Sequence, residues 1–185
     1  MNHNSDTKEL LSASRASLIF KRFALELVEN YVDLKELAII GLQPRGVALA
    51  EVVMKELKAI TSHDVMFGTL DNTFYRDDIG RSGEIHIPKP SKIDFSMEGK
   101  RIVLIDDVLY TGRSVRSAID GLMRFGRPQS IELMVLVDRV FQREVPIKPD
   151  YIGVSIDSRN TKHYVRVNWL DDNKAEVWLK DKEND

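Results

Sequence analysis

The stretch RIVLIDDVLYTGRS, Arg101 to Ser114, joins an apolar run, two adjacent carboxylates and a short turn of small and polar residues. Its first half, RIVLID, has the length and the unbroken hydrophobicity of a strand buried on both faces of a parallel sheet. Ionised carboxylates are costly to remove from water. We therefore expect this strand to end at Asp106, and we expect Asp106 and Asp107 to lie at an open sheet edge where a ligand pairs with them.

Helical and strand patterns alternate on both sides of this stretch. Apolar residues at three- and four-residue spacing predict helices over 14–31, 47–57 and 114–125. Short apolar runs predict strands over 36–42, 64–70, 101–106, 130–138 and 150–156, and a C-terminal hairpin over about 163–180. This alternation is typical of an α/β fold with a mostly parallel central sheet, helices on both faces and right-handed crossovers.

Composition excludes several classes of site. The length of 185 residues and the 43% of hydrophobic residues fit one domain over 1–185. Because cysteine is absent, disulfides, thiolate zinc sites and a cysteine nucleophile are excluded. The formal net charge of -2 gives no overall attraction to nucleic acid. No apolar leader or long apolar segment is present, so we expect a cytoplasmic protein with no membrane partner.

The turn from Thr111 to Ser114 has the features of a phosphate site. A tight turn into a helix directs free backbone N–H groups and the positive end of the helix dipole at one point, and the side chains add further donors. The carboxylates just before it are suited to a pair of vicinal hydroxyls. The combination indicates a ribose 5-phosphate, whereas TGRS alone would favour an ordinary strand-to-helix turn in which Asp106 acts as a capping residue.

These residues carry a family resemblance. VLIDDVLYTGRS resembles the 5-phosphoribosyl 1-diphosphate (PRPP) signature of the type I phosphoribosyltransferases. The longer stretch VLIDDVLYTGRSVRSAIDGLMRFGRPQSIELMVLVDR is similar to the PyrR family of pyrimidine-operon attenuators, which are also uracil phosphoribosyltransferases. The segments GLQPRGVALA, TLDNTFYRDD and VPIKPDYIG extend the similarity over about 18–179. It implies the type I fold, with a small hood and a flexible flap over about 71–96.

The resemblance implies that the opening stretch binds PRPP. Asp106 and Asp107 would bind its ribose hydroxyls, and the turn 111–114 would surround its 5-phosphate. The implied PRPP site comprises Asp106, Asp107, Val108, Leu109, Tyr110, Thr111, Gly112, Arg113 and Ser114.

A second implied loop binds pyrophosphate through Pro44, Arg45 and Gly46. In this family the loop often has a strained or cis peptide bond. The Gln43-Pro44 bond tolerates the cis form at modest cost, but trans is the default expectation for any such bond.

The implied catalytic residues are Arg76, Asp106 and Asp107. Arg76 would lie at the base of the flap and close over the reacting centre. Without the family match, it would be interpreted as a solvated arginine paired with one of the two aspartates that follow it. The implied cofactor is Mg2+, held through PRPP and water near Asp106 and Asp107 with no direct protein ligand.

The implied base site is formed by Tyr110, Arg139, Val154 and Ile156. In purine phosphoribosyltransferases the position of Tyr110 resembles an aspartate that contacts the base, and a phenol cannot replace that carboxylate at neutral pH. We therefore expect the partners PRPP and a nucleobase, with uracil as the base and UMP as the product; a different base is the less favoured alternative.

An RNA-binding attenuator that senses UMP and PRPP is the alternative function, with an mRNA leader as partner. The chain departs from the family after Arg139, where VFQRE replaces Gly-His-Arg-Glu, and at SIDSRN, where Asp157 adds negative charge that opposes phosphate contacts. A basic patch of Arg15, Arg22, Arg116, Arg124, Arg127, Arg143 and Lys148 could still form. Solvated surface is the favoured interpretation of these residues. The resemblance also implies a homodimer or homotetramer.

Overall fold

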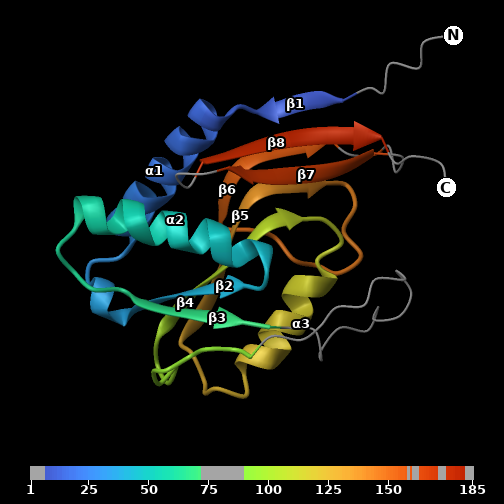
Figure 1. Ribbon diagram of the computed structural model, residues 1–185. Coiled ribbons are helices and arrows are strands. Elements are labelled where there is room, and N and C mark those ends of the chain that lie inside the picture. The colour runs from blue at the N-terminus through green and yellow to red at the C-terminus, as the bar shows by residue number, and fades with distance from the viewer. Residues whose placement is uncertain (1–6, 72–89, 158, 160–162, 171–173, 182–185) are drawn as a thin grey trace, which may run out of the picture.

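Five parallel strands form the central sheet, in the order β3-β2-β4-β5-β6 (Figure 1). The computed structural model describes residues 7–71, 90–157, 159, 163–170 and 174–181. The strands are β2 (Leu37–Leu42), β3 (Met66–Leu70), β4 (Arg101–Leu109), β5 (Ser130–Val140) and β6 (Tyr151–Asp157). β4 lies at the centre, paired with β2 on one side and β5 on the other. The predicted α/β fold is confirmed.

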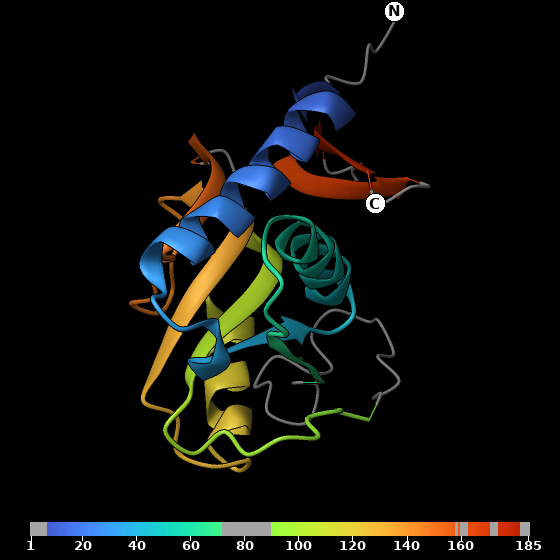
Figure 2. The ribbon, with the colours of Figure 1, turned by 90° about the vertical axis from the view of Figure 1, so that its left-hand side faces the viewer.

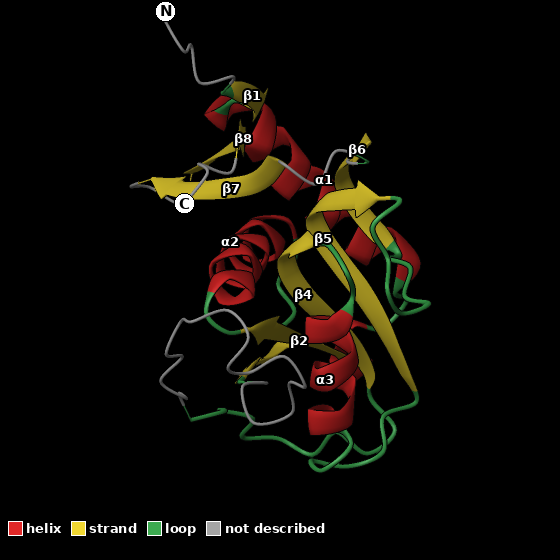
Figure 3. Cartoon of the chain, turned by 90° about the vertical axis from the view of Figure 1, so that its right-hand side faces the viewer, coloured by secondary structure: helices red, strands yellow, loops and turns green. Residues whose placement is uncertain are grey.

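Helices cover both faces of this sheet, as the sequence predicts. Helices α1 (Ala13–Asn30) and α2 (Arg45–Ile60) lie on one face, and α3 (Arg113–Leu122) lies on the other (Figures 2 and 3). A short 3-10 helix, η1 (Leu34–Glu36), leads from α1 into β2. The alternating side chains of each strand therefore enter two separate hydrophobic clusters, one beneath each layer of helices.

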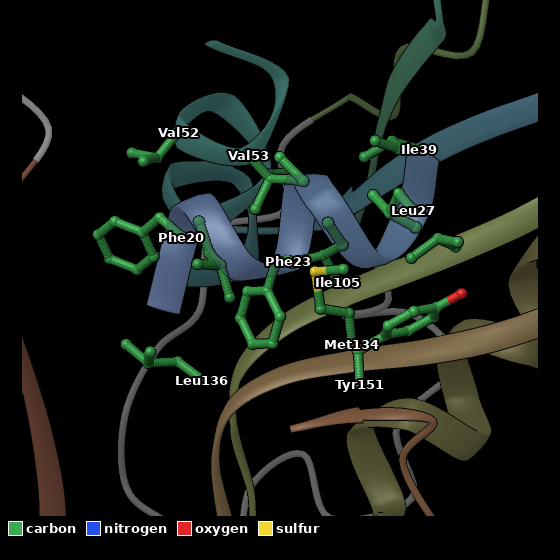
Figure 4. Packing of buried hydrophobic residues seen from close by; sticks show 14 of the residues in the cluster. Phe20, Phe23, Leu27, Ile39, Val52, Val53, Ile105, Met134, Leu136 and Tyr151 are labelled. Atoms are coloured by element: carbon green, nitrogen blue, oxygen red, sulfur yellow. The ribbon is translucent and has the colours of Figure 1, made fainter. Parts of the chain in front are cut away.

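The larger cluster is built on one stripe of α1. Phe20, Phe23 and Leu27 recur at three- and four-residue spacing, and each is 1% exposed or less. They pack against sheet residues that include Ile105 and Met134 (Figure 4). Because Ile105 directly precedes the two carboxylates, this packing fixes the strand that delivers them.

A second sheet forms a hood over α1 and α2. Its strands β1 (Lys8–Leu11), β7 (His163–Leu170) and β8 (Lys174–Asp181) are antiparallel, in the order β1-β8-β7 (Figure 3). Leu11 and Val177 face each other across β1 and β8 and join the larger cluster. The sequence did not predict β1, because four residues of mixed polarity carry too little periodicity to be identified.

Several element ends differ from the prediction by one to three residues, and two of these differences lie in the stretch that carries the carboxylates and the helix after them. β4 continues through both carboxylates to Leu109 instead of ending at Asp106. Helix α3 ends at Leu122, three residues before the predicted end, because the N–H groups of Arg124 and Phe125 bond to carbonyls three residues back and Gly126 then adopts a φ of 139°.

Most of the predicted flap lies outside the described residues, and so does Arg76. At its end, Lys92 exchanges two backbone hydrogen bonds of 2.8 Å with Thr69. Over the part of the chain that the structure describes, no helix is both long enough and apolar enough to cross a membrane.

Substitution of Leu27 by alanine should reveal how strongly α1 holds the sheet. Leu27 is 0% exposed, so Leu27→Ala should lower the free energy of unfolding by about 2–5 kcal/mol, measured by urea denaturation. Glu29 lies on the same helix and is exposed, so Glu29→Ala should change stability by less than about 0.5 kcal/mol. Equal losses in the two variants would contradict this assignment of the buried face.

Candidate active site

Asp106 and Asp107 lie where β4 no longer pairs with β2 but still pairs with β5. The last residue pair of β2 and β4 is Gly41 with Ile105, whereas β5 accompanies β4 as far as Leu109. The pair is thus open on the side of β2 only. Asp107 is 4% exposed and its Oδ2 atom has no hydrogen-bond partner, which corrects the expectation of a solvated edge.

Burial and mutual repulsion favour the protonated forms of this pair. Burial is the largest cause that raises the pKa of Asp106 well above its usual range, and the charge of Asp107 adds to it. Burial also raises the pKa of Asp107, while the guanidinium of Arg45 opposes both increases. Asp106 Oδ1 accepts a hydrogen bond of 2.9 Å from the backbone N–H of Asp107. A cationic or hydrogen-bond-donating ligand would relieve this cost.

The predicted pyrophosphate loop lies beside the carboxylates. The Gln43-Pro44 bond is cis, so the default expectation of a trans bond is wrong. Helix α2 begins at Arg45, and an added Cβ at Gly46 would lie 2.2 Å from the carbonyl oxygen of Ile105. Only glycine lets the first turn of α2 approach β4 this closely. The amino end of α2 and Arg45 are therefore brought next to Asp106.

A cavity of about 350 Å³ adjoins this loop. Gln43 forms part of its wall and donates from Nε2 to Thr69 Oγ1 at 3.2 Å and to the Pro90 carbonyl at 3.1 Å. Its lining residues are Gln43, Pro44, Val47, Thr69, Pro90 and Lys92. The cavity thus lies between the predicted pyrophosphate loop and the described end of the flap segment.

The predicted phosphate turn forms the start of α3. Gly112 caps the helix with a φ of 87°, a backbone conformation that favours glycine. The first N–H groups of a helix have no acceptor within it, so those that begin at Arg113 are directed at the turn. The Arg113 guanidinium instead donates to Glu144 Oε2 at 2.5 Å. The contribution of Arg113 to an anion site would therefore come from its backbone.

Val108 and Leu109 connect the carboxylates to this turn without presenting side chains to it. Leu109 is 1% exposed and packs in the cluster beneath α3, while Val108 packs against the cluster beneath α1 and α2. Their backbone would be what they offer a ligand.

The predicted base residues come from β5, β6 and the residue that follows β4. The Arg139 guanidinium lies 4.2 Å from the ring centroid of Tyr110, and its Nη2 donates to the His163 carbonyl at 3.1 Å. Arg139 is 4% exposed, and burial lowers its pKa. Ile156 pairs with Arg139 across the sheet. Val154 lies two residues before it on β6 and packs partly against the core. Tyr110, Arg139 and Ile156 therefore share one end of the sheet.

Sequence reasoning missed an ion pair between the end of β5 and the loop that follows it. Asp138 is 5% exposed and accepts a hydrogen bond from the Arg143 guanidinium. Both surface interpretations of Arg143, as part of a basic patch or as a solvated side chain, are therefore wrong, because its side chain is 20% exposed and directed inward. A signal was present, since a carboxylate that ends a buried strand needs a partner and Arg143 follows five residues later.

Comparison with known proteins places these features in a family. A family model for the phosphoribosyl transferase domain matches residues 6–172. The bifunctional protein PyrR of Acetivibrio thermocellus is 44% identical over 151 residues, which cover 82% of each chain. The protein of the same name from Caldicellulosiruptor bescii is 39% identical over 178 residues, covering 95% of this chain and 97% of the other.

Solved structures share the fold at lower identity. A hypoxanthine phosphoribosyltransferase from Trypanosoma cruzi, solved as a ternary complex with substrates, superposes with a TM-score of 0.69 at 18% identity and covers 95% of this chain and 96% of that one. A hypoxanthine-guanine phosphoribosyltransferase from Bacillus anthracis has a TM-score of 0.67 at 17% identity, with 85% and 86% coverage. At these identities the likeness shows the fold alone.

Neutralising one carboxylate should stabilise the protein in the absence of ligand. Because the pKa of Asp106 is raised on folding, the folded chain keeps a proton that the unfolded chain loses above about pH 4, and stability should fall as pH rises through the raised pKa. Asp106→Asn should therefore raise the free energy of unfolding at pH 7 and reduce its decline above about pH 4. Urea denaturation between about pH 4 and pH 8 measures both effects.

Asp120→Asn is the matched control, because Asp120 is 57% exposed on α3 and should leave that pH dependence unchanged. If Asp106→Asn were less stable than the parent protein at pH 7, the assigned cost of the buried pair would be wrong.

Proposed function

This chain belongs to the phosphoribosyltransferase family and, within it, to the proteins named bifunctional protein PyrR, and we propose that it transfers the phosphoribosyl group of PRPP to uracil. One observation carries the proposal. A carboxylate pair, of which Asp107 is buried with an unpartnered oxygen, lies five residues before the glycine that caps a helix start. A ligand with vicinal hydroxyls next to a phosphate would satisfy both features at once, and PRPP has both groups.

The phosphate turn and the carboxylates would hold the two ends of the ribose 5-phosphate. Backbone N–H groups at the start of α3 would donate to the phosphate oxygens, with the helix dipole adding to the attraction. The ribose hydroxyls would donate to Asp106 and to the unpartnered Oδ2 of Asp107. These hydrogen bonds favour the ionised carboxylates and so lower the raised pKa values of the pair.

The pyrophosphate would bind at the amino end of α2, next to Arg45 and Gly46. Arg45 is exposed at the first helical position, where its guanidinium and the helix dipole both attract an anion. Arg76 lies outside the described residues, and its proposed role over the reacting centre rests on the family resemblance.

The proposed reaction breaks the bond between ribose C1 and a pyrophosphate oxygen and forms a bond from C1 to a ring nitrogen of uracil, which loses its proton. Positive charge develops on the ribose and negative charge on the leaving pyrophosphate. The carboxylates of Asp106 and Asp107 would stabilise the first, and Arg45 with the start of α2 would stabilise the second.

The residues of this site fit Mg2+ held through PRPP. Across the described residues, no group of three or more histidine, cysteine, aspartate or glutamate side chains could hold a metal ion alone. The ion's ligands would therefore come from PRPP oxygens and water, and Asp107 Oδ2 would accept a hydrogen bond from such a water. When bound, Mg2+ would neutralise charge on the pyrophosphate.

Uracil is the proposed base because of the pair formed by Tyr110 and Arg139. The Tyr110 ring is occupied on one face by the Arg139 guanidinium, at 4.2 Å, and offers no carboxylate to a purine. The polar edge of a pyrimidine would instead meet the backbone of β6 beside Ile156.

A second function, RNA binding, is favoured by one feature of the segment that departs from the family. Phe141 is 67% exposed, and the Arg159 guanidinium lies 4.8 Å from its ring centroid. Arg159 also pairs with Asp157 at 2.7 Å, which offsets the negative charge expected to repel RNA. An exposed aromatic ring beside a cation is a suitable platform for an unstacked RNA base.

Assembly as a homodimer or homotetramer also belongs to this proposal. Leu18, Leu25 and Ile60 leave apolar area exposed on α1 and α2, at 67%, 56% and 45%. A second copy of the chain would cover such area.

Pyrophosphate release from PRPP and Mg2+ should depend on the base supplied. Among uracil, guanine, hypoxanthine and orotate, we expect turnover with uracil, and turnover with none of the four would contradict the proposed activity.

Asp107→Asn should weaken PRPP binding about tenfold or more, because it removes a charged acceptor. Asp120→Asn should leave PRPP binding unchanged, and unaltered affinity in Asp107→Asn would refute the ribose assignment.

A gel shift against the chain's own pyrimidine-operon leader tests the second function. Binding should tighten with UMP, and Phe141→Ala should weaken it about fivefold or more through the loss of one stacked base. Phe125→Ala is the control, since Phe125 is 40% exposed at a distant turn after α3. Failure of the parent protein to bind the leader RNA would eliminate this function.

A further inference from the structure

Arg143 is hydrogen-bonded to the main chain just before the phosphate turn and to the main chain of β5 and its own loop. Its Nε donates to the Ile147 carbonyl at 3.1 Å, and its Nη1 donates to the Leu109 carbonyl at 3.3 Å and to the Arg139 carbonyl at 3.1 Å. Nη1 also donates to the Tyr110 carbonyl, and Nη2 donates to the carboxylate of Asp138. All three guanidinium nitrogens are therefore in use.

These contacts hold the turn where the sheet no longer can. The carbonyls of Leu109 and Tyr110 are the last of β4 and the first beyond it, because the β4–β5 register ends at Leu109. Backbone carbonyls that leave a sheet need other donors if they are to remain in one conformation. Arg143 supplies those donors, and its own charge is balanced by Asp138, which is 5% exposed.

The residues after Arg143 also bond to the phosphate turn. The N–H groups of Glu144 and Val145 donate to the Thr111 carbonyl at 3.0 and 3.3 Å. The Glu144 carboxylate holds the Arg113 guanidinium at 2.5 Å. An added Cβ at Gly112 would lie 2.7 Å from Val145 Cγ2, so the loop fits directly against the turn. Residues 143–147 therefore lie against the phosphate turn at Thr111, Gly112 and Arg113.

We propose that Arg143 is a positioning residue for PRPP, which holds the entry to the phosphate turn 111–114 so that the turn keeps the shape that binds the 5-phosphate. This role rests on the proposed function and adds a residue that would not itself touch the substrate. The planar guanidinium suits the role, because it can bond several carbonyls and a carboxylate together, whereas a lysine ammonium lacks that geometry. It also means that Arg143 acts inside the protein and is not an RNA-facing cation.

Arg143→Met tests the role in the full-length chain by two kinds of measurement, one of PRPP binding and turnover and one of hydrogen exchange. Isothermal titration with PRPP and Mg2+ should give a dissociation constant about tenfold weaker or more, and kcat at saturating PRPP should stay within about threefold. Hydrogen exchange without ligand should be faster at the amides of Glu144 and Val145, which donate to Thr111. Exchange at Val165 and Val177 in the hood should be unchanged.

Arg143→Lys should fall between the parent protein and Arg143→Met, since it keeps the charge next to Asp138 without the planar fork. Arg166→Met is the matched control, because Arg166 is an exposed arginine on β7 and should leave both measurements unchanged. If Arg143→Met does not fold, the double variant Asp138→Asn/Arg143→Gln removes both buried charges together and should show the same weakening and the same faster exchange.

Two results would overturn the role: PRPP affinity in the folded variant within about twofold of the parent, or faster exchange spread equally through the hood. If the parent protein binds no PRPP, the proposed function fails separately. The exchange of Glu144 and Val145 then still decides whether Arg143 holds the turn.

Discussion

The organisation of this molecule depends on the burial of β4 on both faces. A strand between two layers of helices can carry ionisable groups only near its end, and here β2 stops pairing at Ile105 while β5 continues to Leu109. The space left on one side is filled by the first turn of α2, which the absence of a side chain at Gly46 permits. The carboxylates, Arg45 and the amino ends of two helices are brought together by this single difference in strand length.

The same arrangement explains why the site reduces the stability of the folded protein when no ligand is bound. Asp107 is buried with one unpartnered oxygen, and the pKa values of both carboxylates are raised by burial. Groups of this kind reduce stability and persist where function requires them. By contrast, Asp138 is equally buried but has Arg143 as its partner. The molecule thus satisfies Asp138 with a charged partner and leaves an oxygen of Asp107, the aspartate proposed to bind PRPP, without one.

The sequence predicted what depends on local pattern. The strand RIVLID, the α1 stripe that contains Phe23, and the turn at Gly112 were all located from spacing and residue type. The hood strand β1 was missed because its stability comes from pairing with β8, which no short window reveals. The inward direction of Arg143 was missed although Asp138 offered it a partner, because its other acceptors are carbonyls from three segments, and carbonyl positions leave no trace in residue identity.

The hood also constrains the order in which the chain folds. β1 pairs with β8, so Lys8 lies opposite Leu179, and nearly the whole chain separates the two strands (Figure 1). Contacts between such distant segments form late, because the entropy of closing the loop must be met first. During synthesis, Leu11 and the outward side of α1 and α2 stay uncovered until β7 and β8 have been made. The central sheet can then form first, with an apolar surface that stays uncovered until the C-terminal strands close over it.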